Sequence, residues 1–246
     1  MIAVAVDTDT IQFWEVKSGK ESGALKGISG HTNLLALSPD HRFLFTTNTV
    51  RYQGDTAKLW NVSKQKEIVA LKLSDVWSAV FSPKSNFLAC IVDGRAGLRV
   101  WDVRSQRELF ALNRDLKSAA RPTFGPIAFS PDEEIVAIAQ QNDYSEPFVV
   151  NLFSTSERKL LAILKGHEGQ ISSISFSPDG KTIATGSNDG TVKLWSATTY
   201  QQLISPLSPQ PTRGIGSVLF SPDGKTLAVG DEEGTIRFLY TASRHR

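Results

Sequence analysis

The chain has 246 residues, of which 40% are hydrophobic and 21% are charged, a composition that is typical of a globular protein and excludes a disordered one. The formal net charge of +2 excludes a strong overall field that would attract nucleic acid or an anionic membrane. The single cysteine, Cys90, excludes an internal disulfide and fits a cytoplasmic location. No apolar run reaches the roughly 20 residues that cross a bilayer, so we expect no membrane partner.

The first residues predict a β-hairpin and a third strand. We expect strands at 2–6, 11–16 and around 24–25, with a polar turn between the first two. Asp7 and Asp9 in this turn also resemble the phosphoaspartate motif of haloacid-dehalogenase-type phosphatases, in which the first carboxylate attacks phosphorus. That enzyme fold alternates strands with helices. This chain lacks the alternation, so the hairpin is the favoured interpretation.

From residue 28 onward the chain repeats one pattern. A Ser-Pro pair occurs at residues 38, 82, 130, 177 and 221, in steps of 44 to 48 residues. An apolar pair, mostly Leu-Trp, follows each at 59–60, 100–101, 152–153, 194–195 and 238–239, with an extra copy at 13–14. Two independent marks that share one period indicate a repeat architecture.

Each repeat predicts short strands joined by tight turns. In the fifth repeat, the turn Ser-Pro-Asp-Gly at 177–180 separates two strands, and Asn-Asp-Gly at 188–190 predicts a hairpin. The stretch 191–195 alternates apolar and polar residues as a strand does. The stretch 154–164 begins with the helix-capping pattern Ser154-x-x-Glu157. Its register places it before the fourth strand of a repeat, so we expect a strand there.

A four-stranded sheet of this kind cannot bury both faces alone, but neighbouring sheets that stack around an axis bury them together. The sequence therefore predicts an all-β fold, a β-propeller of four-stranded antiparallel blades in one domain over 1–246. We place the repeats at 1–27, 28–72, 73–113, 114–165, 166–208 and 209–246. The first repeat lacks an inner strand and the last repeat lacks an outer one. The sequence therefore predicts about five and a half to six blades, in a ring that need not close completely.

Three explanations of the incomplete ring stay open. The chain is the C-terminal part of a longer protein or a mis-started reading frame, or it closes as six unequal blades through side-chain packing. In the third explanation, a second chain fills the gap. The first and third leave an unpaired sheet edge, which is prone to aggregation.

The fifth repeat resembles a known family. Gly166-His167, the turn 177–180, Asp189-Gly190 and Leu194-Trp195 are similar to the signature of the WD40 repeats. The sequence of residues 221–228, SPDGKTLA, resembles the repeats of the bacterial branch of that family. The resemblance implies a propeller that serves as a non-enzymatic scaffold for protein–protein interaction.

The resemblance also implies a structural chain of hydrogen bonds. In the fifth repeat His167 would bridge Asp189 and the hydroxyl of Thr185, which would accept from the indole of Trp195. The corresponding residues of the second repeat are His31, Thr46, Asp55 and Trp60, where a longer hairpin leaves the position of Asp55 open. The third, fourth and sixth repeats carry Cys90, Ile138 and Val229 where Thr185 stands, so apolar packing replaces the polar chain there.

We expect no catalytic residue, metal or cofactor. The four histidines, His31, His41, His167 and His245, show no zinc-ligand spacing. The sequence holds no nucleophile elbow, Walker loop or dinucleotide-binding glycine pattern. It also has no basic stripe with interleaved aromatic residues, so nucleic acid is not an expected partner. A hydrolase site assembled from distant loops and a nucleic-acid-associated propeller are the alternative functions.

Departures from the repeat predict where a protein partner binds. Three connections, 48–55, 113–125 and 140–148, are longer than the repeat requires, and loops on a rigid scaffold often carry recognition. Their candidate contact residues are Arg51, Tyr52, Arg121, Tyr144 and Glu146. Trp77 aligns with Ser172 at the start of an inner strand, near the mouth of the axial channel. It either fills a gap in the channel or contacts the partner.

Overall fold

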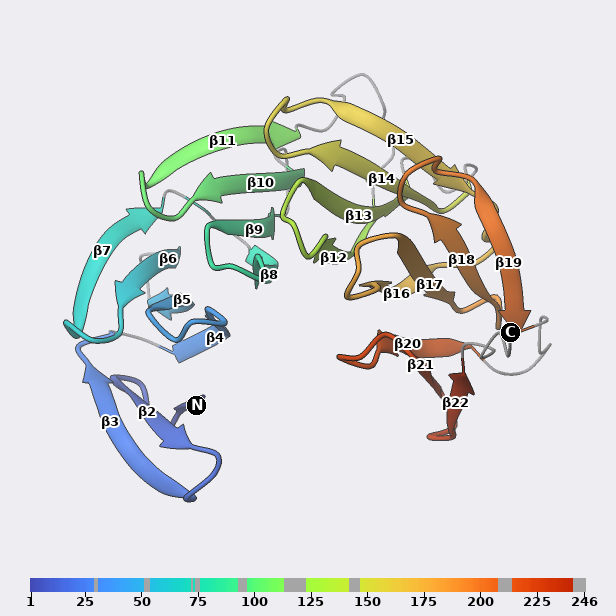
Figure 1. Ribbon diagram of the computed structural model, residues 1–246. Coiled ribbons are helices and arrows are strands. Elements are labelled where there is room, and N and C mark those ends of the chain that lie inside the picture. Colours follow the sequence, from blue (N-terminus) through green and yellow to red (C-terminus); the bar gives the residue numbers. More distant parts are fainter. Residues whose placement is uncertain are drawn as a thin grey trace. The chain divides into compact units, whose positions relative to one another are not determined.

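The computed structural model of the protein describes residues 1–28, 31–50, 54–71, 73, 76–92, 97–112, 123–141, 147–207 and 214–240. These residues form 22 strands in six antiparallel sheets, with no helix among them (Figure 1). The sheets belong to two compact units, Met1–Arg114 and Asp115–Arg246. The all-β fold of antiparallel propeller-type sheets that the repeat predicts is confirmed.

Unit 1, Met1–Arg114, holds three sheets whose strands pair in chain order. The first consists of β1 (Ile2–Ala5), β2 (Thr10–Glu15) and β3 (Lys20–Lys26). The second consists of β4 (His31–Leu37), β5 (Phe43–Val50), β6 (Gly54–Asn61) and β7 (Lys66–Leu71). The third consists of β8 (Val76–Phe81), β9 (Phe87–Val92), β10 (Gly97–Asp102) and β11 (Arg107–Leu112).

Unit 2, Asp115–Arg246, repeats this arrangement. The fourth sheet consists of β12 (Thr123–Phe129), β13 (Ile135–Gln141), β14 (Val149–Ser154) and β15 (Leu160–Lys165). The fifth consists of β16 (Ile171–Phe176), β17 (Thr182–Ser187), β18 (Val192–Ser196) and β19 (Gln202–Leu207). The sixth consists of β20 (Ile215–Phe220), β21 (Thr226–Asp231) and β22 (Ile236–Tyr240).

The capping pattern at Ser154 closes a turn between two strands instead of starting a helix. The Ser154 hydroxyl accepts a hydrogen bond from the backbone N–H of Glu157 at 3.0 Å, and β15 begins shortly afterwards at Leu160. The prediction of a strand in 154–164 is therefore confirmed. A hydroxyl that caps a short turn and one that caps a helix make the same local bond, so the pattern alone does not distinguish them.

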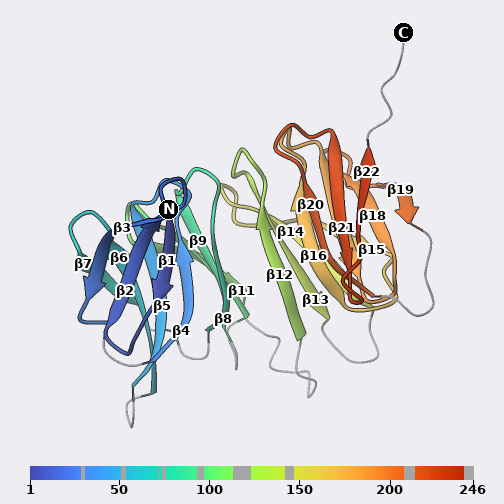
Figure 2. The ribbon, with the colours of Figure 1, turned by 90° about the horizontal axis from the view of Figure 1, so that it is seen from below.

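The three long connections are shorter than predicted. The ladder between β5 and β6 continues to the pair Val50 and Gly54, so strand pairing takes up most of 48–55. In Figure 2 this hairpin reaches beyond the other strands of unit 1. In unit 2, β12 starts at Thr123 and β13 runs to Gln141, which shortens the predicted loops 113–125 and 140–148. Extra residues in these hairpins extend the strands, because paired backbone groups are satisfied without a loop.

Within each unit, neighbouring sheets bury their apolar faces against each other. A cluster that includes Phe45, Leu59, Leu88 and Cys90 fills the space between the second and third sheets. Equivalent clusters join the first to the second sheet, the fourth to the fifth and the fifth to the sixth. Three tryptophans occupy equivalent positions on the third strands of their sheets and are nearly fully buried: Trp60 (4% exposed), Trp101 (7%) and Trp195 (3%). The repeat therefore encodes these cores.

Hydroxyl groups also join the fifth sheet to the sixth. The Ser173 hydroxyl donates to the carbonyl of Val218 at 3.2 Å and accepts from the N–H of the same residue at 3.0 Å. The Ser175 hydroxyl accepts from the N–H of Phe220 at 3.2 Å. These bonds hold inner strands β16 and β20 side by side although each is paired within its own sheet.

The Ser-Pro turns share one backbone conformation. Their fourth residues, His41, Ser85, Glu133, Gly180 and Gly224, have φ between 60° and 72°. The serine that opens each turn accepts a hydrogen bond from the backbone N–H five residues later, as Ser177 does from Thr182 at 2.9 Å. Glycine adopts a positive φ without steric cost, whereas other residues do not.

We predict that Gly180→Ala lowers the free energy of unfolding by about 1 kcal/mol, because its φ of 70° strains any residue with a Cβ. The nearest atom to the added Cβ would be 3.8 Å away, so crowding adds nothing. Gly216→Ala is the control, since Gly216 has no positive φ and also has 3.8 Å of space. Urea unfolding measures both. Equal effects of the two substitutions would contradict the role given to φ.

Candidate interaction site

The fifth sheet contains a buried chain of hydrogen bonds. Nδ1 of His167 lies 3.0 Å from Oδ2 of Asp189, and Nε2 of the same ring lies 2.7 Å from the hydroxyl of Thr185. The indole N–H of Trp195 donates to that hydroxyl at 2.9 Å. Thr185 stands on β17 and Trp195 on β18, so the chain ties two strands to the segment that precedes β16.

The carboxylate of Asp189 determines where the protons of this chain lie. Burial raises the pKa of Asp189, but hydrogen bonds from the hydroxyl and N–H of Thr191 and from the N–H of Glu168 outweigh burial, and the pKa falls from 3.8 to about 2. The ionised carboxylate can only accept, so Nδ1 of His167 carries the proton that it donates to Asp189. Nε2 then accepts from the hydroxyl of Thr185.

His167 is held in its neutral form. Burial lowers its pKa below the ordinary value of 6.5, and this effect exceeds the opposing influence of Asp189. In the neutral ring, the Thr185 hydroxyl donates once to Nε2 and accepts once from Trp195. A proton on Nε2 would remove this acceptor and leave the Thr185 hydroxyl only the longer contact with the carbonyl of Lys193 at 3.5 Å. The chain is therefore complete only while His167 is uncharged.

The second sheet contains part of the same chain. The indole N–H of Trp60 donates to the hydroxyl of Thr46 at 3.0 Å. His31 on β4 and Asp55 on β6 both pair with Thr49 of β5, so the backbone brings them to one end of the sheet. The side chains of His31 and Asp55 lie outside the described part of the structure.

In the other sheets an apolar or weakly polar residue takes the place of Thr185. Cys90, Ile138 and Val229 are all buried at that position of the second strand. Burial raises the pKa of the Cys90 thiol, which keeps it protonated and suits packing rather than reactivity.

Trp77 is the described member of the predicted contact set. It lies on β8 and is 68% exposed, unlike the buried tryptophans of the repeat. The ladder between β8 and β9 pairs Val76 with Val92 and then Ser78 with Ile91, so Trp77 is the extra residue of a β-bulge. A bulge leaves its extra residue unpaired and redirects the side chain. The other predicted contacts, Arg51, Tyr52, Arg121, Tyr144 and Glu146, lie outside the described residues.

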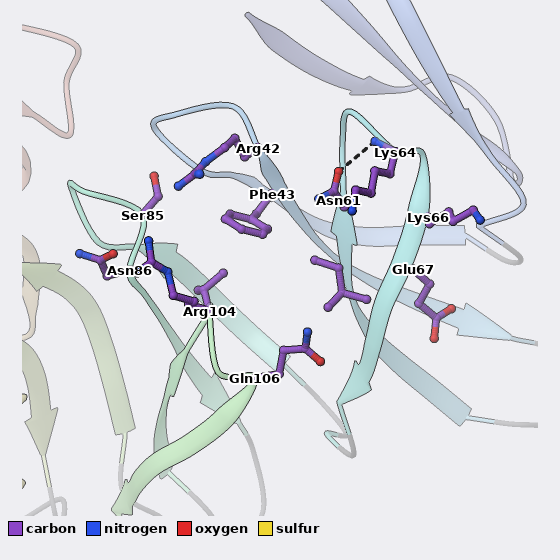
Figure 3. A pocket seen from close by; sticks show the side chains of 12 residues that line it. Arg42, Phe43, Asn61, Lys64, Lys66, Glu67, Ser85, Asn86, Arg104 and Gln106 are labelled. Carbon is purple, nitrogen blue, oxygen red and sulfur yellow. Dashed lines mark hydrogen bonds between the residues drawn. The ribbon is translucent and has the colours of Figure 1, made fainter.

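The sequence did not predict a hollow that lies in unit 1 at the end of the strands opposite to Trp77. It has a volume of about 560 Å³ and lies between the turns of the second and third sheets. Figure 3 shows Arg42, Arg104, Ser85 and Asn86 on one side of it and Lys64 on the other. The signal was present in the sequence as basic residues in the turns that follow Ser-Pro and the apolar pair. Loop length does not indicate this site, because the turns that carry these charges have the ordinary length of the repeat.

Other kinds of site are not seen in the described residues. Across the described ranges, no three His, Cys, Asp or Glu side chains lie close enough together to hold a metal ion. The same residues contain no helix with the length and apolar character to cross a membrane.

Comparison with known proteins finds a repeat family in part of the chain. The WD40 family model, described as WD domain, G-beta repeat, matches residues 158–196 and 202–238. These two segments carry WD40 repeats. Both matched segments lie in unit 2, where the hydrogen-bond chain of His167 is complete.

Several curated proteins are similar to parts of the chain. The periodic tryptophan protein 2 homolog of Schizosaccharomyces pombe is 35% identical over 94 residues, which are 38% of this chain and 10% of that protein. The serine-threonine kinase receptor-associated protein of Gallus gallus is 26% identical over 185 residues, 75% of this chain and 45% of that protein. The guanine nucleotide-binding protein subunit beta of S. pombe is 28% identical over 189 residues, 77% of this chain and 58% of that protein. The chain thus spans between a tenth and about three fifths of these relatives.

We predict that Trp195→Ala lowers the free energy of unfolding by about 3–5 kcal/mol, because it leaves a cavity beside the fifth sheet and removes the hydrogen bond that the indole donates to Thr185. Trp195→Phe keeps the apolar volume but removes the N–H donor, so we expect a loss of only about 1 kcal/mol. Chemical denaturation measures both. An unchanged midpoint for Trp195→Ala would contradict its buried position.

We predict that acidification from pH 7.5 to 5 destabilises the protein through His167. Its pKa is lower folded than unfolded, so the unfolded chain binds the proton first and stability falls as pH drops through 6.5. Asp189 does not contribute in this range, because its stabilisation is lost only below its unfolded pKa of 3.8. Urea unfolding at each pH should show this slope in the wild type and in the exposed-turn control His41→Gln, but not in His167→Gln. The same slope in His167→Gln would assign it to another group.

Proposed function

We propose that the chain is a non-enzymatic scaffold that binds a protein partner. The binding surface would be the end of the third sheet at which β8 begins and which carries Trp77. The observation that supports this proposal most directly is a large aromatic side chain, 68% exposed, on a bulge in an otherwise regular strand. Tryptophan is enriched among the residues that dominate protein–protein affinity, and an exposed indole gains most when a partner buries it.

Comparison within the repeat strengthens the case for Trp77. The equivalent residue of the fifth sheet is Ser172, also the extra residue of a bulge, whose hydroxyl donates to the carbonyl of Gly186 at 3.1 Å. A small residue satisfies the backbone at this position, so packing does not require a tryptophan. An indole at this position of the third sheet therefore points to a role outside the fold.

We extend the proposed surface to the residues in the hairpin and intersheet connections. In the repeat, the connections between the second and third strands and those between consecutive sheets lie at the same end of the sheets as Trp77. Such connections contain Arg51, Tyr52, Arg121, Tyr144 and Glu146. Tyrosine and arginine are common anchors of interfaces. We propose them as further contacts of a protein partner and not of nucleic acid or membrane, with the cytoplasm as the location.

The relatives lend support by their names, which describe a receptor-associated protein and a subunit of a guanine nucleotide-binding protein. Both names imply assembly with other proteins. We also propose that a second chain, or a segment outside this sequence, covers the outward face of the sixth sheet. The exposed side chains of Leu219, Ile236 and Phe238 on that face support this.

We predict that a photo-crosslinking amino acid at position 77 captures a discrete protein partner in cells, whereas the same group at Val16 does not. Val16 is similarly exposed, at 66%, but lies in the turn at the opposite edge of the first sheet. With the captured partner purified, Trp77→Ala should weaken its binding at least about tenfold and leave the unfolding midpoint unchanged. Equal capture at both positions, or full affinity in the variant, would refute the proposal.

A further inference from the structure

We propose that the hollow between the turns of the second and third sheets binds an acidic peptide segment, with carboxylates on both sides of an apolar side chain. The site is separate from the Trp77 edge and goes beyond the function proposed above. It is defined by Arg42, Lys64, Lys66 and Arg104 around an apolar floor.

Backbone hydrogen bonds build the walls of the hollow. In the second sheet the N–H of Val62 donates to the carbonyl of Arg42 at 2.9 Å, which ties the turn before β7 to the turn before β5. In the third sheet the N–H of Val103 makes the same bond to Asn86 at 2.8 Å. The N–H of Asp40 donates to the hydroxyl of Ser85 at 3.2 Å and links the two sheets. The hollow is therefore formed before any ligand arrives, which lowers the cost of binding.

The rim has an excess of positive charge. Lys64, Lys66 and Arg104 are exposed, and within the described part of the chain none of the three has an ion-pair partner. The carboxylate of Glu67 in the lining is already engaged by Lys58 at 3.0 Å. Three cations without acidic partners beside one hollow favour an anionic ligand.

Arg42 contributes less charge than the other three. Its Nε lies 2.5 Å from Asp40, and burial raises the pKa of that carboxyl while hydrogen bonds from Arg42 and Ser38 lower it to about 2. Asp40 is therefore ionised and offsets Arg42 in part. The guanidinium also lies 5.5 Å from the ring centre of Phe43, which holds it at the edge of the apolar floor.

The same turns in unit 2 show that the fold does not require these cations. By alignment of the repeats, Glu134 stands where Arg42 does, Glu157 where Lys64 does and Thr198 where Arg104 does. The turn backbone is the same, with φ of 60° at His41 and 72° at Glu133. Lysines do stand at some of these positions elsewhere, since Lys181 aligns with Arg42 and Lys159 with Lys66, but the combination of Arg42, Lys64 and Arg104 is particular to the second and third repeats.

The distribution of charge favours a peptide over a single phosphate group. Figure 3 shows Arg42 and Arg104 on one side of the hollow and Lys64 on the other, with Phe43 between them. One phosphate needs donors that converge on one point, whereas these cations are separated by an apolar floor of Phe43, Ile68 and Val103. A peptide with two carboxylates and an apolar side chain between them matches this arrangement. Protein interfaces likewise have an apolar centre and a polar rim.

The test measures binding of a fluorescent peptide that repeats Glu-Asp-Leu over nine residues. We expect saturable binding that weakens with added salt, and a loss of at least about tenfold in the variant Lys64→Glu with Arg104→Glu. The control variant, Lys159→Glu with Lys181→Glu, changes the net charge equally on exposed turns of unit 2 and should bind as the wild type does. Trp77→Ala should also leave binding unchanged, which separates this site from the proposed partner surface.

Several outcomes would overturn the proposal. These are absence of saturable peptide binding, equal weakening in the control variant, and stronger competition by inorganic phosphate or by a uridine oligonucleotide than by unlabelled peptide. The first would mean that the hollow is not a peptide site, the second that attraction is a general charge effect, and the third that the ligand is a phosphate or nucleic acid. Circular dichroism before and after each substitution confirms that all variants are folded.

Discussion

The structure depends on one constraint, which is that each sheet has two apolar faces and cannot hide both alone. Within each unit the solution is the same: the face of one sheet lies against the face of the next. Leu44 and Trp60 of the second sheet join Ile11 and Leu25 of the first in one cluster. Ala184 and Val192 of the fifth join Ile215 and Val218 of the sixth in another. The hydrophobic effect over these contacts favours stacking.

Polar groups adjust this packing rather than drive it. The chain from His167 to Trp195 satisfies an imidazole and an indole that the sheet buries, and its energetic importance lies mostly in the cost of leaving them unpaired. Sheets with Cys90 or Ile138 at the position of Thr185 lack that chain and yet keep the same strands. The second and third strands of a sheet can therefore be joined in two ways, by a buried chain of hydrogen bonds or by apolar packing.

The repeat allowed most of the backbone to be predicted from sequence. The spacing of Ser-Pro and Leu-Trp located turns and strands, because a tight turn and a buried aromatic residue each need a particular place in a sheet. Loop length was predicted less well. The sequence predicts a loop around Val50 and Gly54, but these two residues pair in the ladder, because polar residues can continue a hairpin as well as end it.

The site features needed information that spacing does not contain. Trp77 and Ser172 are the extra residues of the same bulge in their two sheets, yet Trp77 is exposed and Ser172 only partly so, so alignment of the repeats does not predict the exposure. The hollow results from four turns of two sheets that meet in space, although Arg42 and Arg104 are far apart in the chain. Their charges were visible in the sequence, but their convergence was not.

Strand β8 connects the two proposed surfaces of unit 1. Trp77 is its second residue, and Ser85 follows its end in the turn that lines the hollow. A strand advances about 3.3 Å per residue, so the four steps from Trp77 to Phe81 place the two surfaces about 13 Å or more apart, at opposite ends of one strand. That distance is long enough for two ligands to bind without touching. The strand between them is held by its ladder to β9, so occupation of one end has no bistable element through which to alter the other. The two proposed surfaces are therefore expected to act independently.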